Sequence, residues 1–167
     1  MYLFNGTPRD MMSAVLTDLE GARHPGPNQS AHFRQAMAEL VGIYDRQAAD
    51  GPADAEELAR FRVESGAALQ SLGDAVPGYV AITAAHAEIP DEDELYDLAV
   101  RRSAIQSLLD DYAGTPAADL VDRDEVAELD ADLRRVAVEQ GPLPSDAIPR
   151  GLPESHWWWR LPASTPA

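Results

Sequence analysis

The chain has 167 residues, 45% of them hydrophobic, which is enough for one domain with a substantial core and too few to expect two. It contains no cysteine, which excludes disulfides, thiolate metal sites and cysteine nucleophiles. Its formal net charge of −16 argues against binding to the phosphates of nucleic acids and favours attraction of basic partners.

Basic residues are present only as arginine, 13 in all, and there is no lysine. This excludes Schiff-base chemistry and the lysine of a phosphate-binding loop. The bias towards Ala, Asp, Glu and Arg fits a GC-rich bacterial genome.

The first nine residues have neither a basic region nor an apolar stretch typical of a signal peptide, and no apolar run is long enough to span a bilayer. We therefore expect a soluble, cytoplasmic protein that does not bind membranes.

The N-terminal part of the sequence predicts three helices. Tyr2-Leu3-Phe4 is a short apolar lead, either a strand stub or a cover for one end of the core. Thr7 and Pro8 then mark a helix start, because threonine is a good N-cap and proline suits the first helical position. Ser30 caps a second helix that runs to about Gln47, and Asp54 opens a third.

The middle of the chain predicts three more helical segments. Tyr79–His86 is compact and apolar, which favours a buried helix and leaves a short strand possible. Asp91, Glu92, Asp93 and Glu94 supply four acids at the start of the next helix, where the helix dipole favours them, and this helix runs to about Tyr112. The last helix, about Asp122–Gln140, has apolar residues at three- and four-residue steps.

The C-terminal segment carries all three tryptophans, Trp157, Trp158 and Trp159, flanked by His156 and Arg160. Six of the 26 residues after Gly141 are proline, so we expect an extended arm rather than a helix. In an extended segment Trp158 would face the opposite way from its two neighbours.

Three exposed indoles would form an unusually large apolar patch, so we expect them to be covered. The cover is either the body of the chain itself or a partner. Protonation of His156 near neutral pH is a conceivable way to loosen the arm.

No catalytic, cofactor or metal motif is recognisable. The four histidines are scattered, and the acids from Asp122 to Asp132 lack the glycine and glutamate that a calcium loop requires. Nucleophile elbows, glycine-rich phosphate loops and dinucleotide fingerprints are missing from the sequence. We therefore expect no cofactor and no metal. An enzyme with a site assembled from distant residues stays open and would need a concave pocket with converging polar groups.

The acidic residues are unevenly placed along the chain. From Glu88 to Asp132 there are fifteen Asp or Glu and three Arg, a net charge of −12. Such a run is usually a solvated helix face, but it can also be a surface that meets a basic protein.

These observations predict a single all-α domain over residues 1–140, an irregular bundle of five or six helices, followed by a proline-rich tail at 141–167. The predicted function is a non-enzymatic protein-interaction protein, an adaptor or assembly component that binds a protein partner or its own second copy. An acidic inhibitor or immunity-type protein that neutralises a basic effector is the alternative. The candidate partner-binding residues are His156, Trp157, Trp158, Trp159 and Arg160 in the tail, together with Asp91, Glu92, Asp93 and Glu94.

Overall fold

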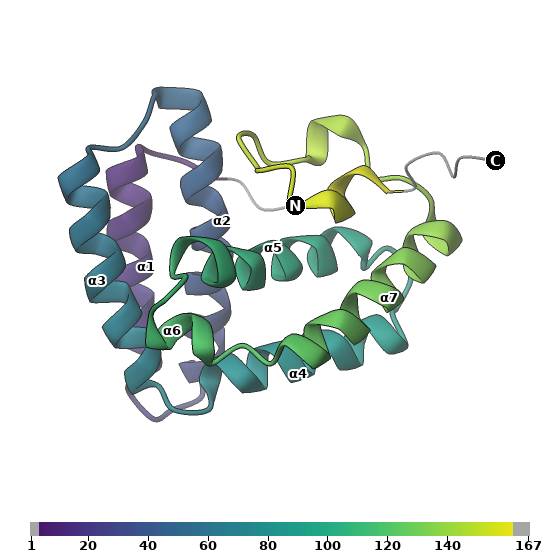
Figure 1. Ribbon diagram of the computed structural model, residues 1–167, viewed down its shortest axis with the longest axis horizontal. Coiled ribbons are helices and arrows are strands. Elements are labelled where there is room, and N and C mark those ends of the chain that lie inside the picture. The colour runs from purple at the N-terminus through teal and green to yellow at the C-terminus, as the bar shows by residue number, and fades with distance from the viewer. Residues whose placement is uncertain (1–3, 162–167) are drawn as a thin grey trace.

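The computed structural model describes residues 4–161, and all regular secondary structure in that range is helical, without a strand (Figure 1). This confirms the all-α prediction, although the described part of the chain forms seven α-helices rather than five or six. Tyr2 and Leu3 lie outside the described residues. The elements are α1 (Pro8–Ala22), α2 (Gln29–Asp50), α3 (Ala55–Ser71), α4 (Ala75–Glu88), α5 (Leu95–Asp111), α6 (Pro116–Asp119), α7 (Arg123–Gln140) and the 3-10 turns η1 (Ser145–Ala147) and η2 (Trp157–Arg160).

Three of the helices begin at side-chain caps that are visible in the sequence. The Thr7 hydroxyl accepts the backbone N–H of Asp10 at 3.1 Å, and the Asp10 carboxylate accepts the N–H of Thr7 at 2.8 Å. Asp54 and Asp122 cap α3 and α7 in a similar way, each accepting two backbone N–H groups of the first turn. These bonds satisfy donors that a helix start would otherwise leave without partners.

The helices form two groups that share one core. In Figure 1, α1, α2 and α3 lie side by side, while α5 runs from them across the molecule, with α4 and α7 paired beneath it. Apolar side chains of both groups make a single cluster that includes Met37, Leu69, Leu108 and Leu129, all fully buried.

The extra helix and the boundaries of α4 differ from the sequence prediction. The sequence predicted no helix between Tyr112 and Asp122, but Pro116 starts the one-turn helix α6. α4 begins at Ala75, ahead of the apolar segment predicted from Tyr79, and is only half buried: Val80 is inaccessible, whereas Ile82 is 56% exposed. The predicted helix is therefore present, but only one of its sides is buried, because no element among the described residues covers the other side.

The C-terminal segment from Gly141 to Leu161 returns across the body of the protein as a strap, drawn in yellow-green to yellow in Figure 1. It was predicted to be extended, but it contains the two 3-10 turns. Gly151 allows the strap to approach α2, because it adopts φ +72° and a Cβ there would lie 2.7 Å from the carbonyl oxygen of Tyr44. None of the described helices has the length and apolar composition needed to cross a membrane.

Candidate functional site

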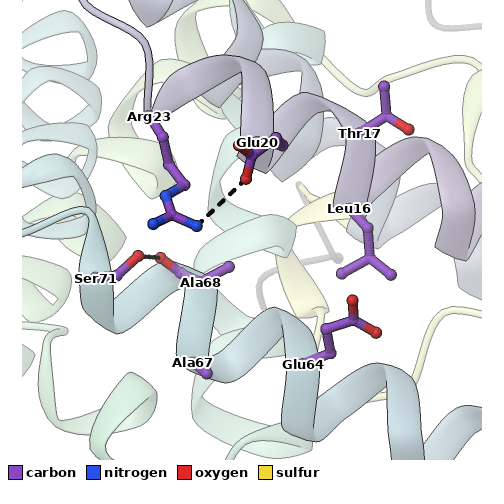
Figure 2. Close-up of a pocket in the computed structure, with 8 residues that line it drawn as sticks. All are labelled: Leu16, Thr17, Glu20, Arg23, Glu64, Ala67, Ala68 and Ser71. Carbon is purple, nitrogen blue, oxygen red and sulfur yellow. Dashed lines mark hydrogen bonds and ion pairs between the residues drawn. The ribbon is translucent and has the colours of Figure 1, made fainter.

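The groove between α1 and α3 is large but open (Figure 2). It has a volume of about 610 Å³, and small residues such as Ala67 and Ala68 line much of it. Its charged groups are Glu20, Arg23 and Glu64, and Arg23 is engaged by Glu20 at 3.3 Å. The groove therefore offers no set of polar groups that converge on a ligand.

A second groove, of about 490 Å³, lies between the N-terminal part of α2 and the exposed side of α4. Phe33 and Tyr79, whose ring centroids are 5.8 Å apart in an edge-to-face arrangement, contribute to its apolar wall. The groove also receives Arg34, His86 and Arg101. Sequence reasoning missed this groove because its residues come from four separate segments.

The tryptophans of the strap are buried by the protein itself. Trp158 and Trp159 are each 1% exposed, and Trp157 is half-buried. Because η2 is a 3-10 turn, the two consecutive indoles Trp158 and Trp159 both enter the core, which corrects the alternation expected of an extended chain. Arg160 stays exposed at the end of the turn.

Ser103 of α5 is the polar centre onto which the strap docks. Its hydroxyl oxygen accepts the indole N–H of Trp159 at 2.7 Å and that of Trp158 at 3.0 Å, and Nδ1 of His156 lies 2.9 Å away. The Trp158 N–H also reaches the carbonyl oxygen of Ala99 at 3.0 Å. The strap thus satisfies both indole N–H groups and Nδ1 of His156 inside the core. We call Ser103, His156, Trp158 and Trp159 the serine hub.

Two arginines cover the outer faces of the indoles. The guanidinium of Arg102 lies 4.3 Å from the ring centroid of Trp158, and that of Arg134 lies 4.1 Å from the ring centroid of Trp157. Arg102 is itself buried and makes a bidentate pair with Asp130 at 2.6 and 3.2 Å. These cation–π contacts join the strap to α5 and α7.

His156 is fully buried, and burial lowers its pKa to about 4. The charge of Asp110 opposes this shift, and the nearby cations Arg102 and Arg160 make smaller contributions that also lower the pKa. The imidazole is therefore neutral at physiological pH. The sequence-based idea that His156 titrates near neutral pH was wrong, because sequence alone did not place the ring inside the core.

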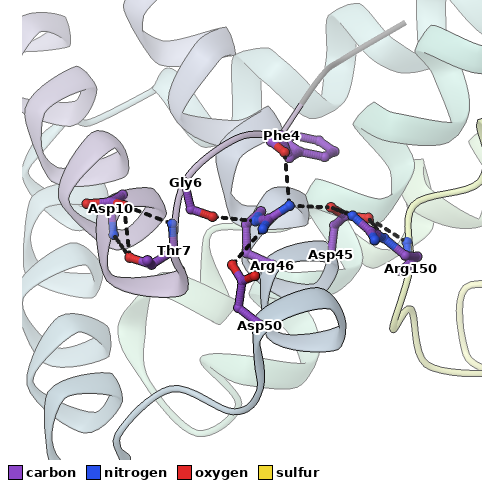
Figure 3. Close-up of polar contacts among 8 residues, drawn as sticks. All are labelled: Phe4, Gly6, Thr7, Asp10, Asp45, Arg46, Asp50 and Arg150. Atoms are coloured by element: carbon purple, nitrogen blue, oxygen red, sulfur yellow. Dashed lines mark hydrogen bonds and ion pairs between the residues drawn. The ribbon is translucent and has the colours of Figure 1, made fainter.

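Two consecutive residues of α2, Asp45 and Arg46, bind the strap and the segment before α1 (Figure 3). Asp45 accepts hydrogen bonds from the backbone N–H and the Nε of Arg150 at 2.9 and 3.0 Å. Arg46 donates to the carbonyl oxygens of Gly6 at 2.6 Å and Phe4 at 3.3 Å. Burial acts to raise the pKa of Asp45, but the hydrogen bonds from Arg150 and the charge of Arg46 outweigh it, so this pKa lies below its ordinary value.

The acidic segment Asp91–Glu94 forms the loop between α4 and α5 rather than the first turn of a helix, and Asp93 adopts φ +66°. Gln140 at the end of α7 holds this loop, donating to the carbonyl oxygen of Asp91 at 3.0 Å and accepting the N–H of Leu95 at 3.2 Å.

The acids near Asp122 lie at the other end of α7, about 27 Å away. The acidic run is therefore spread over the α4–α5 loop, α5, α6 and the first half of α7. Asp91, Glu92 and Asp93 are exposed, whereas Trp158 and Trp159 are buried. Tyr96, two residues after the loop, packs edge-to-face on Trp159 with 5.6 Å between the ring centroids.

A buried carboxyl group lies between α1 and α2. Glu39 is 8% exposed, and its Oε1 accepts a hydrogen bond from Gln35 at 3.1 Å. Its Oε2 has no hydrogen-bond partner in the described part of the chain. Burial raises the pKa of Glu39 to about 7; the Gln35 hydrogen bond opposes the shift and nearby Asp18 adds to it. Asp18 in turn lies 2.6 Å from Nδ1 of His32.

Within residues 4–161, no three His, Asp or Glu side chains gather in a way that could hold a metal ion. His86 in the second groove has Arg101 Nη1 as a neighbour at 3.4 Å, and no hydroxyl group among the described residues is hydrogen-bonded to it. Within the described residues, the lining of the second groove therefore shows no hydroxyl group paired with a histidine base.

Comparison with known proteins provides no relative. No protein-family model matches the sequence, no curated protein matches it, and no solved structure matches the fold.

Proposed function

We propose that the protein is a non-enzymatic protein-interaction protein, an adaptor or assembly component, that binds a basic protein partner through the loop Asp91–Glu94 and the adjoining surface of α7. The observation that supports it best is the distribution of free acidic groups. Asp91, Glu92 and Asp93 are exposed and make no ion pair with any residue in the described range.

The arginines near this surface are engaged elsewhere. Arg101 pairs with Asp97 at 2.8 Å and Arg102 with Asp130 at 2.6 Å. Arg135 donates to the carbonyl oxygens of Ala87 and Glu88, both at 2.9 Å, which ties α7 to the end of α4. The loop acids therefore keep their charge available for an external cation.

Two apolar side chains accompany the loop acids. Ile89 at the end of α4 is 82% exposed, and Val138 near the end of α7 is 75% exposed. Arg135 and Gln140, which flank Val138 in sequence, both contact the segment around Ile89. An apolar pair within an acidic surrounding fits a basic partner that also buries some apolar area, because interfaces combine an apolar centre with a polar rim.

The tryptophans have a different role in this proposal. Trp158 and Trp159 are fully buried in the serine hub, so they support the surface indirectly by holding the strap, α5 and α7 together. A partner that used them as anchors would first have to detach the strap.

The test is a binding assay in two stages. The intact protein is immobilised, partners are recovered from an extract of its native cells and identified, and the affinity of the purified partner is measured at low and physiological salt. We expect a basic partner whose affinity falls steeply with salt, because exposed charges are screened.

The decisive variant replaces the loop acids: Asp91→Asn, Glu92→Gln and Asp93→Asn together. We expect it to weaken binding at least tenfold, about 1.4 kcal/mol, and to reduce the salt dependence. The matched control, Glu20→Gln, Glu56→Gln and Glu64→Gln, removes the same charge from α1 and α3 and should bind normally. Equal affinity of the two triple variants would contradict the proposal.

A further inference from the structure

The exposed side of α4 is uncharged, which is unusual in this strongly acidic chain. Between Ala75 and Ala87 there is no Asp, Glu, Lys or Arg. Ala81, Ile82 and Ala85 nevertheless face solvent, and Ile82 is 56% exposed. An exposed apolar helix side next to a concavity is typical of a binding surface.

The groove along α4 has the size and lining of a small-molecule site. Its volume of about 490 Å³ falls within the ~300–1,000 Å³ of typical ligand pockets. Phe33, Leu72, Tyr79 and Ile82 give it apolar surface that could cover a hydrocarbon or aromatic body.

The polar groups of the groove favour a negatively charged head group. Arg34 is exposed and makes no ion pair or hydrogen bond through its side chain within residues 4–161. Arg101 donates Nε–H to Asp97 at 2.8 Å and keeps further N–H groups. Asp74 is the one carboxylate in the lining of the groove. A guanidinium binds carboxylates well because its N–H groups can form two parallel hydrogen bonds.

The net charge of −16 does not prevent this binding, because salt screens exposed charges beyond about 8 Å at physiological ionic strength. The local lining therefore decides which ligand is favoured.

We propose that the groove between α2 and α4 binds a small amphipathic organic acid, with its apolar body against Phe33, Tyr79 and Ile82 and its carboxylate at Arg34. This site is separate from the acidic loop of the proposed function and does not depend on it.

Decanoate is the probe, and 1-decanol is the neutral comparison with the same chain length. Binding is followed by backbone amide chemical shifts of the intact protein. We expect saturable shifts confined to the start of α2, the α3–α4 turn and α4, with decanol binding at least fivefold more weakly, about 1 kcal/mol. Equal binding of the two probes, or no saturable shift up to the solubility limit of decanoate, would overturn the proposal.

Two variants locate the head group and the apolar body. Arg34→Gln should weaken decanoate about tenfold, the effect of losing one charge-assisted hydrogen bond, and leave decanol unchanged. Ile82→Glu should abolish binding of both. Each has a matched control outside the groove, Arg23→Gln and Val63→Glu, which should bind decanoate normally; Val63 is 75% exposed on α3.

Two other occupants are distinguishable in the same experiment. If the α4 amides shift with protein concentration when no decanoate is present, a second copy of the chain fills the groove. If a peptide with a blocked C-terminus displaces decanoate at a lower concentration than decanoate itself requires, the groove is a peptide site. Either result would overturn the proposal of a small organic acid.

Discussion

Ser103 and His156 can be hydrogen-bonded in one direction only. The serine oxygen already accepts two indole N–H groups, at 2.7 and 3.0 Å, which occupies both of its lone pairs. Its own proton must therefore point towards Nδ1 of His156, 2.9 Å away. The imidazole is consequently neutral and protonated on Nε2, an atom that is buried without a partner among the described residues.

The first prediction concerns the serine hub. Ser103→Ala removes the acceptor of Trp159 and the donor to His156, so we expect a loss of about 2–4 kcal/mol in the free energy of unfolding, measured by urea denaturation. Ser107→Ala is the matched control, because Ser107 is also buried on α5 but bonds only to the carbonyl oxygen of Ala104 at 2.6 Å. Equal losses in the two variants would show that the hydrogen bonds of the serine hub add no more stability than those of another buried serine.

The second prediction is an acid-sensitive strap. The pKa of His156 is about 4 in the folded protein, below the ordinary value of 6.5, so protonation favours the unfolded state. Its contribution to stability is complete above pH 6.5 and is lost progressively as the pH falls towards 4, by about 1.4 kcal/mol per pH unit.

The measurement compares the wild type with His156→Gln from pH 7 to pH 4. The variant should be less stable at pH 7 but should lose less stability on acidification, so that the two curves converge. Parallel curves would mean that His156 does not titrate over this range.

The third prediction concerns Glu39, whose pKa is shifted in the opposite direction from that of His156. The pKa of Glu39 is about 7 in the folded protein, above its ordinary value of 4.5, so the folded state holds this proton more tightly. The contribution to stability is complete below pH 4.5 and is lost as the pH rises to about 7. Glu39→Gln, which stays neutral, should therefore gain stability over the wild type with rising pH, by up to about 3 kcal/mol at pH 8. Glu64→Gln, at an exposed position, is the control and should follow the wild-type curve in urea titrations.

The fourth prediction separates the tryptophans. Trp158→Ala should cost about 3–5 kcal/mol, because it empties a fully buried site. Trp157→Ala should cost roughly 1–2 kcal/mol, since its ring is half-buried and mainly contacts Arg134 and Trp158. Tryptophan emission of the intact protein should be blue-shifted and poorly quenched by acrylamide. Emission typical of indole in water would contradict the buried strap.

Local signals in the sequence predicted the helical fold well. Thr7 and Asp54 were recognisable as caps because each bonds to backbone groups two or three residues away. Ser30 was expected to cap the second helix, but it lies inside α2, whose N-cap Asn28 makes no side-chain capping bond. The need to cover the tryptophans was also predictable from their area. Whether the cover came from the chain or from a partner could not be decided, because the sequence does not show which surface faces the indoles.

The candidate sites depend on long-range relationships that the sequence does not contain. Ser103 is an ordinary polar residue until His156, 53 positions later, is placed beside it. The apolar segment Tyr79–His86 indicated a buried helix, but only the packing of α4 shows that its outer side stays open. The groove at Arg34 and Ile82 was invisible for the same reason.

The strap also constrains how the protein is made. α5 passes beneath His156–Trp159, and these residues are synthesised more than forty positions after α5 is complete. Until then, the side of α5 that carries Ala99 and Ser103 lacks the tryptophans that cover it in the folded protein. Closure of the strap over this side of α5 has to wait until residues 156–159 have been synthesised, so it is a late step of folding.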